Sequence, residues 1–149
     1  MKTLQPKTRE EVAALFKKAR LPLTLQRLAV YERLAQSHDH PSAESLYKAL
    51  KPRYPSLSLA TVYKTLQTLQ KMSLIKAVDS PSAQARYDAL TDVHHHAVCS
   101  RCGKIEDVFD ASLDKLPTPA NVRGFQAAGH SVHFHGHCAA CVKSRRNHV

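Results

Sequence analysis

The four cysteines of this 149-residue chain form two pairs, each with two residues between its members. Cys99 and Cys102 make the first pair, Cys138 and Cys141 make the second, and 35 residues lie between the two pairs. Two intervening residues let both thiolates of a tight turn point at one ion, and two such turns complete a tetrahedral site. The pattern therefore predicts a closed four-sulfur site with zinc as the expected occupant. Iron in a similar site and a redox-active dithiol remain alternatives.

Histidines and aspartates form a second group of metal-binding side chains. His94, His95 and His96 precede two apolar residues, and alternation along a strand puts His94 and His96 on one face. Asp88 lies shortly upstream and Asp107 shortly downstream. Imidazole with carboxylate is a donor set that suits Mn²⁺, Fe²⁺ or Zn²⁺ rather than a thiolate site. A polar strand edge without any metal is the alternative interpretation.

A third group of histidines lies between residues 130 and 137. The last three of them alternate along the chain with Val132, Phe134 and Gly136. We therefore expect these three histidines to share one strand face while Val132 and Phe134 pack inward. We expect this face to be exposed or to bind metal weakly. The histidines of the group are His130, His133, His135 and His137.

Positive charge is concentrated in the front half of the chain. Residues 1–83 hold 14 basic and 6 acidic side chains, whereas residues 84–149 hold 8 and 6. All four cysteines and eight of the ten histidines lie after residue 93. Such asymmetry indicates that the front half binds a polyanion and that the back half is a metal-binding module.

The front half shows the periodicity of helices followed by a hairpin. Apolar spacing predicts helices over Arg9–Ala19 and Leu59–Ser73, with two more that begin near Thr24 and Ser42. Two short β-like runs follow, at Leu74–Val78 and Ala85–Leu90, around a Ser-Pro-Ser turn. Several helices and then a two-stranded ribbon outline a winged helix-turn-helix, in which one helix enters the major groove of DNA.

The helix over Leu59–Ser73 is the candidate reading helix. Its apolar row contains Leu59, Val62, Tyr63, Leu66 and Leu69, and polar side chains on its other faces could meet bases or phosphates. Solvated helix faces are the alternative for any single side chain, but the charge imbalance and the helix order favour double-stranded DNA. We expect the DNA contacts to come from Arg20, Arg27, Thr61, Tyr63, Lys64 and Thr65.

Composition excludes several other classes. Apolar residues make up 43% and charged residues 23% of the chain, which is typical of a folded protein and not of a disordered one. No stretch approaches the roughly 20 apolar residues of a membrane span, and residues 1–10 contain no apolar segment for a signal peptide. We therefore expect a cytoplasmic protein with reduced cysteines. A zinc deaminase would need His-x-Glu, but His94-x-His96 lacks the glutamate, so we expect no enzyme. A passive metal buffer would leave the basic front half unexplained.

Four stretches of the chain together resemble the ferric uptake regulator (Fur) superfamily of metal-dependent bacterial repressors. They occur in the family's order and cover nearly the whole chain. The stretches are residues 40–48 (HPSAESLYK), 58–66 (SLATVYKTL), 94–104 (HHHAVCSRCGK) and 136–141 (GHCAAC).

The resemblance implies a two-domain α+β fold. Residues 1–88 would be the winged-helix DNA-binding domain, 89–93 the hinge, and 94–149 an α/β domain that binds metal and makes a homodimer. Pro117 and Pro119 fall where the family usually has a helix, so we expect that helix to be short. The resemblance also implies that the four cysteines hold structural Zn²⁺ and that the dimer binds a palindromic operator.

The resemblance places a regulatory metal site on five residues and an additional site on three. An Asp at position 107 is associated with the peroxide-sensing (PerR-like) branch of the family. The regulatory residues are His40, Asp88, His94, His96 and Asp107, and the additional ones are His95, Asp114 and His130.

The function that this resemblance implies is repression that depends on bound Fe²⁺ or Mn²⁺. One ion held by ligands from both halves would set the angle between them and so the spacing of the two reading helices. Peroxide, acting through bound iron, would oxidise His40 or His94 and release the DNA. A repressor of metal uptake that binds iron or manganese reversibly is the alternative, and a sensor of zinc is a weaker one.

Overall fold

The computed structural model describes residues 4–119 and 122–146. The chain divides into two compact units, residues 1–92 and residues 93–149. In the described part of the chain, no helix is both long and apolar enough to cross a membrane.

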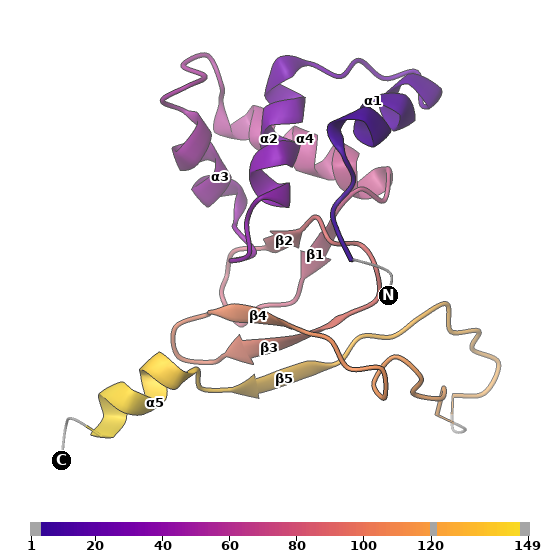
Figure 1. Cartoon of the computed structure of the whole chain (residues 1–149), viewed down its shortest axis with the longest axis vertical. Helices are drawn as coiled ribbons and strands as arrows, with labels where there is room; N and C mark the ends of the chain where they lie inside the picture. Colours follow the sequence, from indigo (N-terminus) through magenta and orange to yellow (C-terminus); the bar gives the residue numbers. More distant parts are fainter. Residues whose placement is uncertain (1–3, 120–121, 147–149) are drawn as a thin grey trace. The chain divides into compact units, whose positions relative to one another are not determined.

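The first unit begins with four helices, which Figure 1 labels. Each starts after a Thr or Ser whose side-chain oxygen accepts a hydrogen bond from the backbone N–H three residues on. These bonds satisfy donors that a helix N-terminus leaves without a partner, which confirms the helix starts predicted at Thr24, Ser42 and Ser58. The helices are α1 (Arg9–Lys18), α2 (Leu25–Ala35), α3 (Ala43–Leu50) and α4 (Leu59–Lys71).

Helices α2, α3 and α4 pack on one another around the main apolar core. Val62, Leu66 and Leu69 line the inner face of α4 and are fully buried, and Val30 and Leu34 of α2 are equally buried. Residues spaced three and four apart lie on one side of a helix, so each helix presents a continuous apolar row to this core.

A short antiparallel hairpin follows α4. It pairs β1 (Lys76–Val78) with β2 (Arg86–Asp88), and Lys76 lies opposite Asp88 in its register. Tyr87, between Arg86 and Asp88 on β2, is buried in the helical core. Because its side chain points the opposite way from those of its neighbours, Arg86 and Asp88 share the other face of the strand.

The second unit is built on a three-stranded sheet of order β4-β3-β5. β3 (His95–Cys99) runs antiparallel to β4 (Ile105–Val108) and parallel to β5 (His133–Gly136). Helix α5 (Ala139–Arg146) follows β5 directly, next to the turn that joins β3 to β4 (Figure 1). The sheet therefore brings the ends of β3 and β5, which are far apart in sequence, to one edge.

The second unit buries few apolar side chains of its own. Val98 and Ile105 are fully buried, whereas Phe109, Phe125 and Phe134 are 49–65% exposed. The prediction that Phe134 packs inward was wrong, because Phe134 lies opposite Ala97 in the register, on the other sheet face from the buried Val98. Within residues 109–132, apart from positions 120–121, the structure has turns and no helix, so the short helix expected here does not form in the described residues.

Helices followed by a hairpin, and then a mixed sheet with a terminal helix, confirm the predicted α+β fold with a winged-helix first unit. The assignment of residues 1–88 to DNA binding, 89–93 to a hinge and 94–149 to dimerisation stays a prediction.

Candidate metal centres and nucleic-acid interface

The four cysteines converge in the second unit. Their sulfur atoms all lie within 4.8 Å of one another, and none is in a disulfide. Sγ of Cys102 lies 3.6 Å from Sγ of Cys138. Zinc–sulfur bonds of about 2.3 Å in a tetrahedron put neighbouring sulfurs about 3.8 Å apart, so the separation fits one ion shared by all four.

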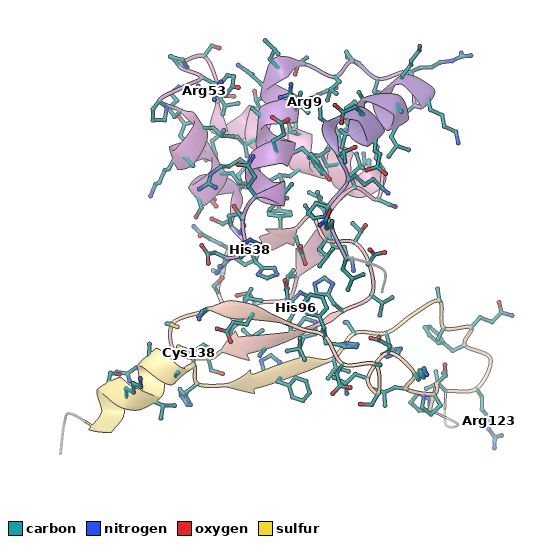
Figure 2. The ribbon with its side chains drawn as sticks, viewed as in Figure 1. Arg9, His38, Arg53, His96, Arg123 and Cys138 are labelled. Atoms are coloured by element: carbon teal, nitrogen blue, oxygen red, sulfur yellow. The ribbon has the colours of Figure 1, made fainter. Side chains whose placement is uncertain are left out.

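The backbone at the edge of the sheet brings the two cysteine pairs together. The N–H of Ser100 donates to the carbonyl of Gly136, 2.8 Å away, which ties the end of β3 to the end of β5. Gly103 has a φ of 74°, a left-handed conformation that glycine adopts without strain, and its N–H donates to the carbonyl of Cys99. The second pair lies where β5 passes into α5, and Figure 2 shows Cys138 at this junction.

Local hydrogen bonds prepare two of these thiols for metal binding. The backbone N–H of Cys102 points at Sγ of Cys99 and, with that of Cys138, lowers the pKa of the Cys99 thiol to about 5. The N–H of Cys141 likewise lowers the pKa of Cys138. Burial raises the pKa of Cys141 to about 12, and the neighbouring sulfurs add to this effect. Four thiolates can therefore coexist here only around a cation.

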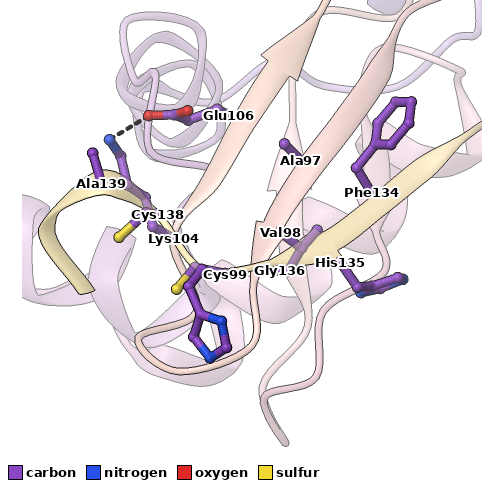
Figure 3. Close-up of a pocket in the computed structure, with 11 residues that line it drawn as sticks. Ala97, Val98, Cys99, Lys104, Glu106, Phe134, His135, Gly136, Cys138 and Ala139 are labelled. Carbon is purple, nitrogen blue, oxygen red and sulfur yellow. Dashed lines mark hydrogen bonds and ion pairs between the residues drawn. The ribbon is translucent and has the colours of Figure 1, made fainter. Parts of the chain in front are cut away.

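A pocket of about 280 Å³ adjoins the four-cysteine cluster. Figure 3 shows the ion pair between Lys104 and Glu106 beside Cys138, with Phe134 and His135 further along β5. Lys104 and Glu106 neutralise each other, and the imidazoles of His135 and His137 also line the pocket. The cluster thus has the features of a closed structural site.

A second cluster in the same unit joins two imidazoles to one carboxylate. Oδ1 of Asp107 lies 3.3 Å from Nε2 of His94 and 3.6 Å from Nε2 of His96. The pairing of His96 with Asp107 across β3 and β4 creates this arrangement, and the two histidine rings meet edge to face at 4.7 Å. Three donors of this kind suit Mn²⁺, Fe²⁺ or Zn²⁺.

The ring of Phe109 forms one wall of this second cluster. It stacks on His94 with ring centroids 5.5 Å apart and so limits how the imidazole can turn. Sequence reasoning missed Phe109. The available signal was its position two residues after Asp107, on the same face of an extended segment.

The first unit holds a separate pair of donors, His40 and Asp88. Nε2 of His40 lies 3.5 Å from Oδ2 of Asp88. The other oxygen of Asp88 accepts a hydrogen bond of 2.7 Å from the N–H of Leu90, which orients the carboxylate. His40 lies just before α3 and has a φ of 49°. Each unit thus forms its own part of the predicted regulatory set, and the full five-residue site stays a prediction.

The predicted additional site contains a hydrogen-bonded pair instead of converging donors. Nδ1 of the fully buried His95 accepts from the N–H of Val132, so its Nε2 carries the proton and donates to Asp114 at 3.0 Å. His130 stacks on His95, and its Nε2 lies 2.6 Å from the carbonyl of Leu113. His95 and Asp114 thus form a hydrogen-bonded pair, and the three-residue metal site stays a prediction.

The candidate reading helix presents some of the predicted contacts to solvent. Lys64 is exposed on α4, and Tyr63 is 39% exposed, with its hydroxyl donating to Oε1 of Glu44 at 2.5 Å. The expectation that Tyr63 belongs to the apolar row was therefore wrong. The side chain of Thr61 is bonded to Ser58 at the start of the helix and is half-buried.

The predicted contact between Thr65 and DNA does not fit its position. Its side chain is 1% exposed, because it lies three residues after Val62 and four before Leu69 on the buried row of α4. Arg20 is exposed after α1, and the Arg27 guanidinium donates to the carbonyl of Pro22 at 2.7 Å. Figure 2 shows another cation, Arg53, between α3 and α4.

Comparison with known proteins identifies the family. Residues 18–143 match the profile of the Ferric uptake regulator family. A peroxide operon regulator from Bacillus subtilis is 36% identical over 140 residues, which cover 93% of this chain and 96% of that protein. The chain belongs to the ferric uptake regulator family. A second member, the peroxide-responsive repressor PerR of Staphylococcus epidermidis, is 35% identical over 89% of each chain. These relatives confirm the resemblance to the peroxide-sensing branch.

Solved structures of the Fur family agree with the fold. The peroxide stress regulator of Campylobacter jejuni is 33% identical, with a TM-score of 0.65 over 91% of this chain and 99% of that one. The ferric uptake regulator of Helicobacter pylori, described as having three functional metal binding sites, superposes with a TM-score of 0.75. It is 23% identical, and the match covers 93% of this chain and 96% of that one, so it supports the shared fold.

Proposed function

We propose that this chain is a metal-dependent transcriptional repressor that binds operator DNA as a homodimer and releases it after oxidation by peroxide. The observation that carries the proposal is the convergence of His94 and His96 on one oxygen of Asp107, in a chain with a winged-helix unit. The named relatives, which are peroxide-responsive regulators, support the same function.

The four-cysteine cluster holds Zn²⁺ in this proposal and has a structural role. Zinc does not change its oxidation state and favours closed sulfur sites. The second unit has few buried apolar residues besides Val98 and Ile105. The metal therefore holds the end of β3 to the start of α5, a role that an apolar core would otherwise have. Zinc binding is then part of the folding free energy of this unit.

The regulatory ion joins the two units in this proposal. His40 and Asp88 come from residues 1–92, and His94, His96 and Asp107 come from residues 93–149. Ligands from both units make metal affinity depend on the angle between them. The ion therefore shifts the protein towards the angle at which it binds more tightly, and the size of the shift equals the difference in binding free energy between the two angles. The two α4 helices of a dimer match half-sites about one helical turn apart only at a suitable angle.

Exposed apolar side chains of the second unit support the homodimer. Phe109, Phe125, Phe134 and Val142 are each at least 44% exposed. Burial of these side chains against a second copy would supply the apolar core that the sheet lacks.

The peroxide response depends on the residues that hold the regulatory ion. Ferrous iron, when bound there, would supply the redox chemistry that directs one oxygen atom of peroxide onto a neighbouring imidazole. That oxygen replaces a ring hydrogen of His40 or His94, the ring loses two electrons, and the second oxygen leaves as water. An oxidised imidazole is a poor donor, so the ligand set opens. Mn²⁺ would support DNA binding without this oxidation.

A reversible repressor of iron or manganese uptake is the second candidate. The same donor set favours it, since imidazole and carboxylate bind both ions without any oxidation. The two candidates differ only after exposure to peroxide, because the reversible repressor keeps unmodified histidines.

A gel-shift experiment tests the repressor. Zinc-loaded protein is mixed with genomic DNA fragments with and without Mn²⁺, and retained fragments are sequenced. We expect retention of a few palindromic fragments that requires Mn²⁺ and is lost in His96→Ala. His137→Ala, which changes a neighbour of Cys138 outside both predicted ligand sets, should behave as the unmodified protein. Retention that is equal with and without Mn²⁺ would contradict a metal-dependent repressor.

A further inference from the structure

The guanidinium of Arg86 holds the backbone of the loop that carries His40. Its Nε donates to the carbonyl of His40 itself, and its Nη2 donates to the carbonyl of Asp39 at 2.6 Å. The planar fork of an arginine can reach two adjacent carbonyls at once with its geometry fixed, whereas a lysine offers one flexible point charge. No family motif in the sequence pointed to Arg86.

The conformation of His40 explains why this loop needs to be held. His40 has a φ of 49°, a left-handed value that only a few per cent of non-glycine residues adopt, although histidine adopts it more often than most. Residues 37–42 belong to no helix or strand, so no ladder of hydrogen bonds maintains this conformation. The surrounding contacts must therefore stabilise it.

Three consecutive residues of β2 organise the loop and its metal-binding side chain. Arg86 donates to the two carbonyls, and the N–H of Tyr87 donates to the carbonyl of Pro41 at 3.2 Å. Asp88 places Oδ2 3.5 Å from Nε2 of His40, while its Oδ1 is held by the N–H of Leu90. The strand thus fixes both the backbone and the partner of one imidazole.

We infer that Arg86 is a positioning residue for the regulatory metal site, acting through the backbone of His40. The inference rests on the proposed function, because it assumes that His40 and Asp88 bind the regulatory ion. Residues that orient metal ligands without touching the metal typically change metal affinity by about 10- to 100-fold when they are replaced. Arg86 is such a residue, and it couples the winged-helix hairpin to the ligand.

The sign of the effect separates positioning from simple electrostatics. A fixed positive charge bonded to the carbonyl of a ligand residue repels a bound cation, so charge alone predicts tighter metal binding after Arg86→Gln. Positioning predicts weaker binding, because the loop that carries His40 loses two of its hydrogen bonds. The two roles therefore predict opposite results for the same variant.

The test is titration of the full-length, zinc-loaded protein with Mn²⁺ by calorimetry. We expect Arg86→Gln to weaken Mn²⁺ binding about tenfold or more, and Arg86→Lys to weaken it as well. Arg33→Gln is the matched control, since Arg33 lines the same surface pocket as Arg86 and its guanidinium contacts Ser37 instead of the His40 carbonyl. It should bind as the unmodified protein.

A double variant shows whether Arg86 acts through His40. In a His40→Ala background, Arg86→Gln should weaken Mn²⁺ binding no further. Unchanged or tighter binding in the single variant, or an equal additional loss in the His40→Ala background, would overturn the inference. A lower melting temperature with unchanged affinity would also overturn it, because it would indicate a purely structural role.

Hydrogen exchange provides a readout that does not depend on the metal. In zinc-loaded protein without Mn²⁺, Arg86→Gln should speed exchange of the Tyr87 amide, whose acceptor lies in the same loop, while Arg33→Gln should not. If the unmodified protein bound no Mn²⁺ beyond its zinc, the proposed function would fail. The exchange rate of the Tyr87 amide would then be the only test of whether Arg86 holds the loop. An unchanged rate in Arg86→Gln would overturn that role.

Discussion

Asp107 of β4 contacts His94, the residue just before β3, with 3.3 Å between Oδ1 and Nε2. The same oxygen lies 3.6 Å from Nε2 of His96, so one carboxylate serves two imidazoles. The side chain of aspartate is one methylene shorter than that of glutamate, so in the proposed regulatory site it would leave more room for a further ligand on the ion. An open position of this kind is what a small reactant needs in order to reach a metal.

Lengthening the side chain at position 107 should separate metal binding from the response to peroxide. We expect Asp107→Glu to keep Mn²⁺-dependent DNA binding, because a carboxylate is retained. The longer side chain could bind the ion with both oxygens and fill the open position, so iron-loaded protein should lose DNA binding more slowly in peroxide. Retained DNA fragments measured over time by gel shift give this rate.

Glu106 provides the control for that substitution. It is the neighbouring acidic residue, exposed and paired with Lys104. Glu106→Asp should therefore keep the normal rate of release. Equal rates in Asp107→Glu and the unmodified protein would contradict a role for the short carboxylate.

Loss of one cysteine should destabilise the second unit. We expect Cys102→Ser to lose zinc and to lower the melting temperature by about 10 °C or more, because Val98 and Ile105 alone form little core. Zinc content by elemental analysis and a thermal melt followed by circular dichroism measure the two effects. A variant that melts normally without zinc would exclude a structural role for the metal, and His137→Ala should keep its zinc.

Zinc binding should release protons at neutral pH. The pKa of Cys99 is about 5 in the metal-free protein, so this thiol is already ionised at pH 7, whereas the pKa of Cys141 is about 12 and this thiol must lose its proton on binding. Zinc affinity should therefore rise with pH above 7 and weaken further as pH falls through 5, where Cys99 becomes protonated. Calorimetry in two buffers of different ionisation enthalpy counts the protons. Release of fewer than one proton at pH 7 would contradict this description.

Removing Lys64 should weaken binding to DNA. Lys64 is exposed on α4, so Lys64→Ala should lower the affinity for DNA by about tenfold in moderate salt. The slope of log affinity against log salt concentration should fall by about one, which corresponds to the loss of one phosphate contact. Fluorescence anisotropy with a fragment recovered by gel shift measures both. Lys71→Ala, at the far end of the same helix, is the control. An equal effect of the two variants would indicate non-specific charge attraction and not a reading helix.

Local signals in the sequence predicted much of the fold. Thr24, Ser42 and Ser58 accept hydrogen bonds at helix starts as expected, because capping depends on residues three positions away. The cysteine spacing also predicted the four-sulfur cluster, since two tight turns need only meet to form it.

Non-local packing decided the features that sequence reasoning missed. Thr65 is buried and Tyr63 is exposed because neighbouring helices select which side of α4 faces the core. Phe134 is exposed because alternation along a strand does not say which sheet face is covered. Arg86 donates hydrogen bonds to the carbonyls of His40 and Asp39 in the loop before α3. These residues lie 46 and 47 positions before Arg86 in the sequence, so no local pattern indicates the bonds.

The most direct test of the account is peptide mass mapping after exposure to peroxide. Zinc-loaded protein is prepared without oxygen, loaded with Fe²⁺ or with Mn²⁺, and treated identically. The account predicts one added oxygen on His40 or His94 in the iron sample alone. If iron occupies the site and both histidines stay unmodified, the peroxide-sensing account is contradicted and the reversible metal repressor replaces it.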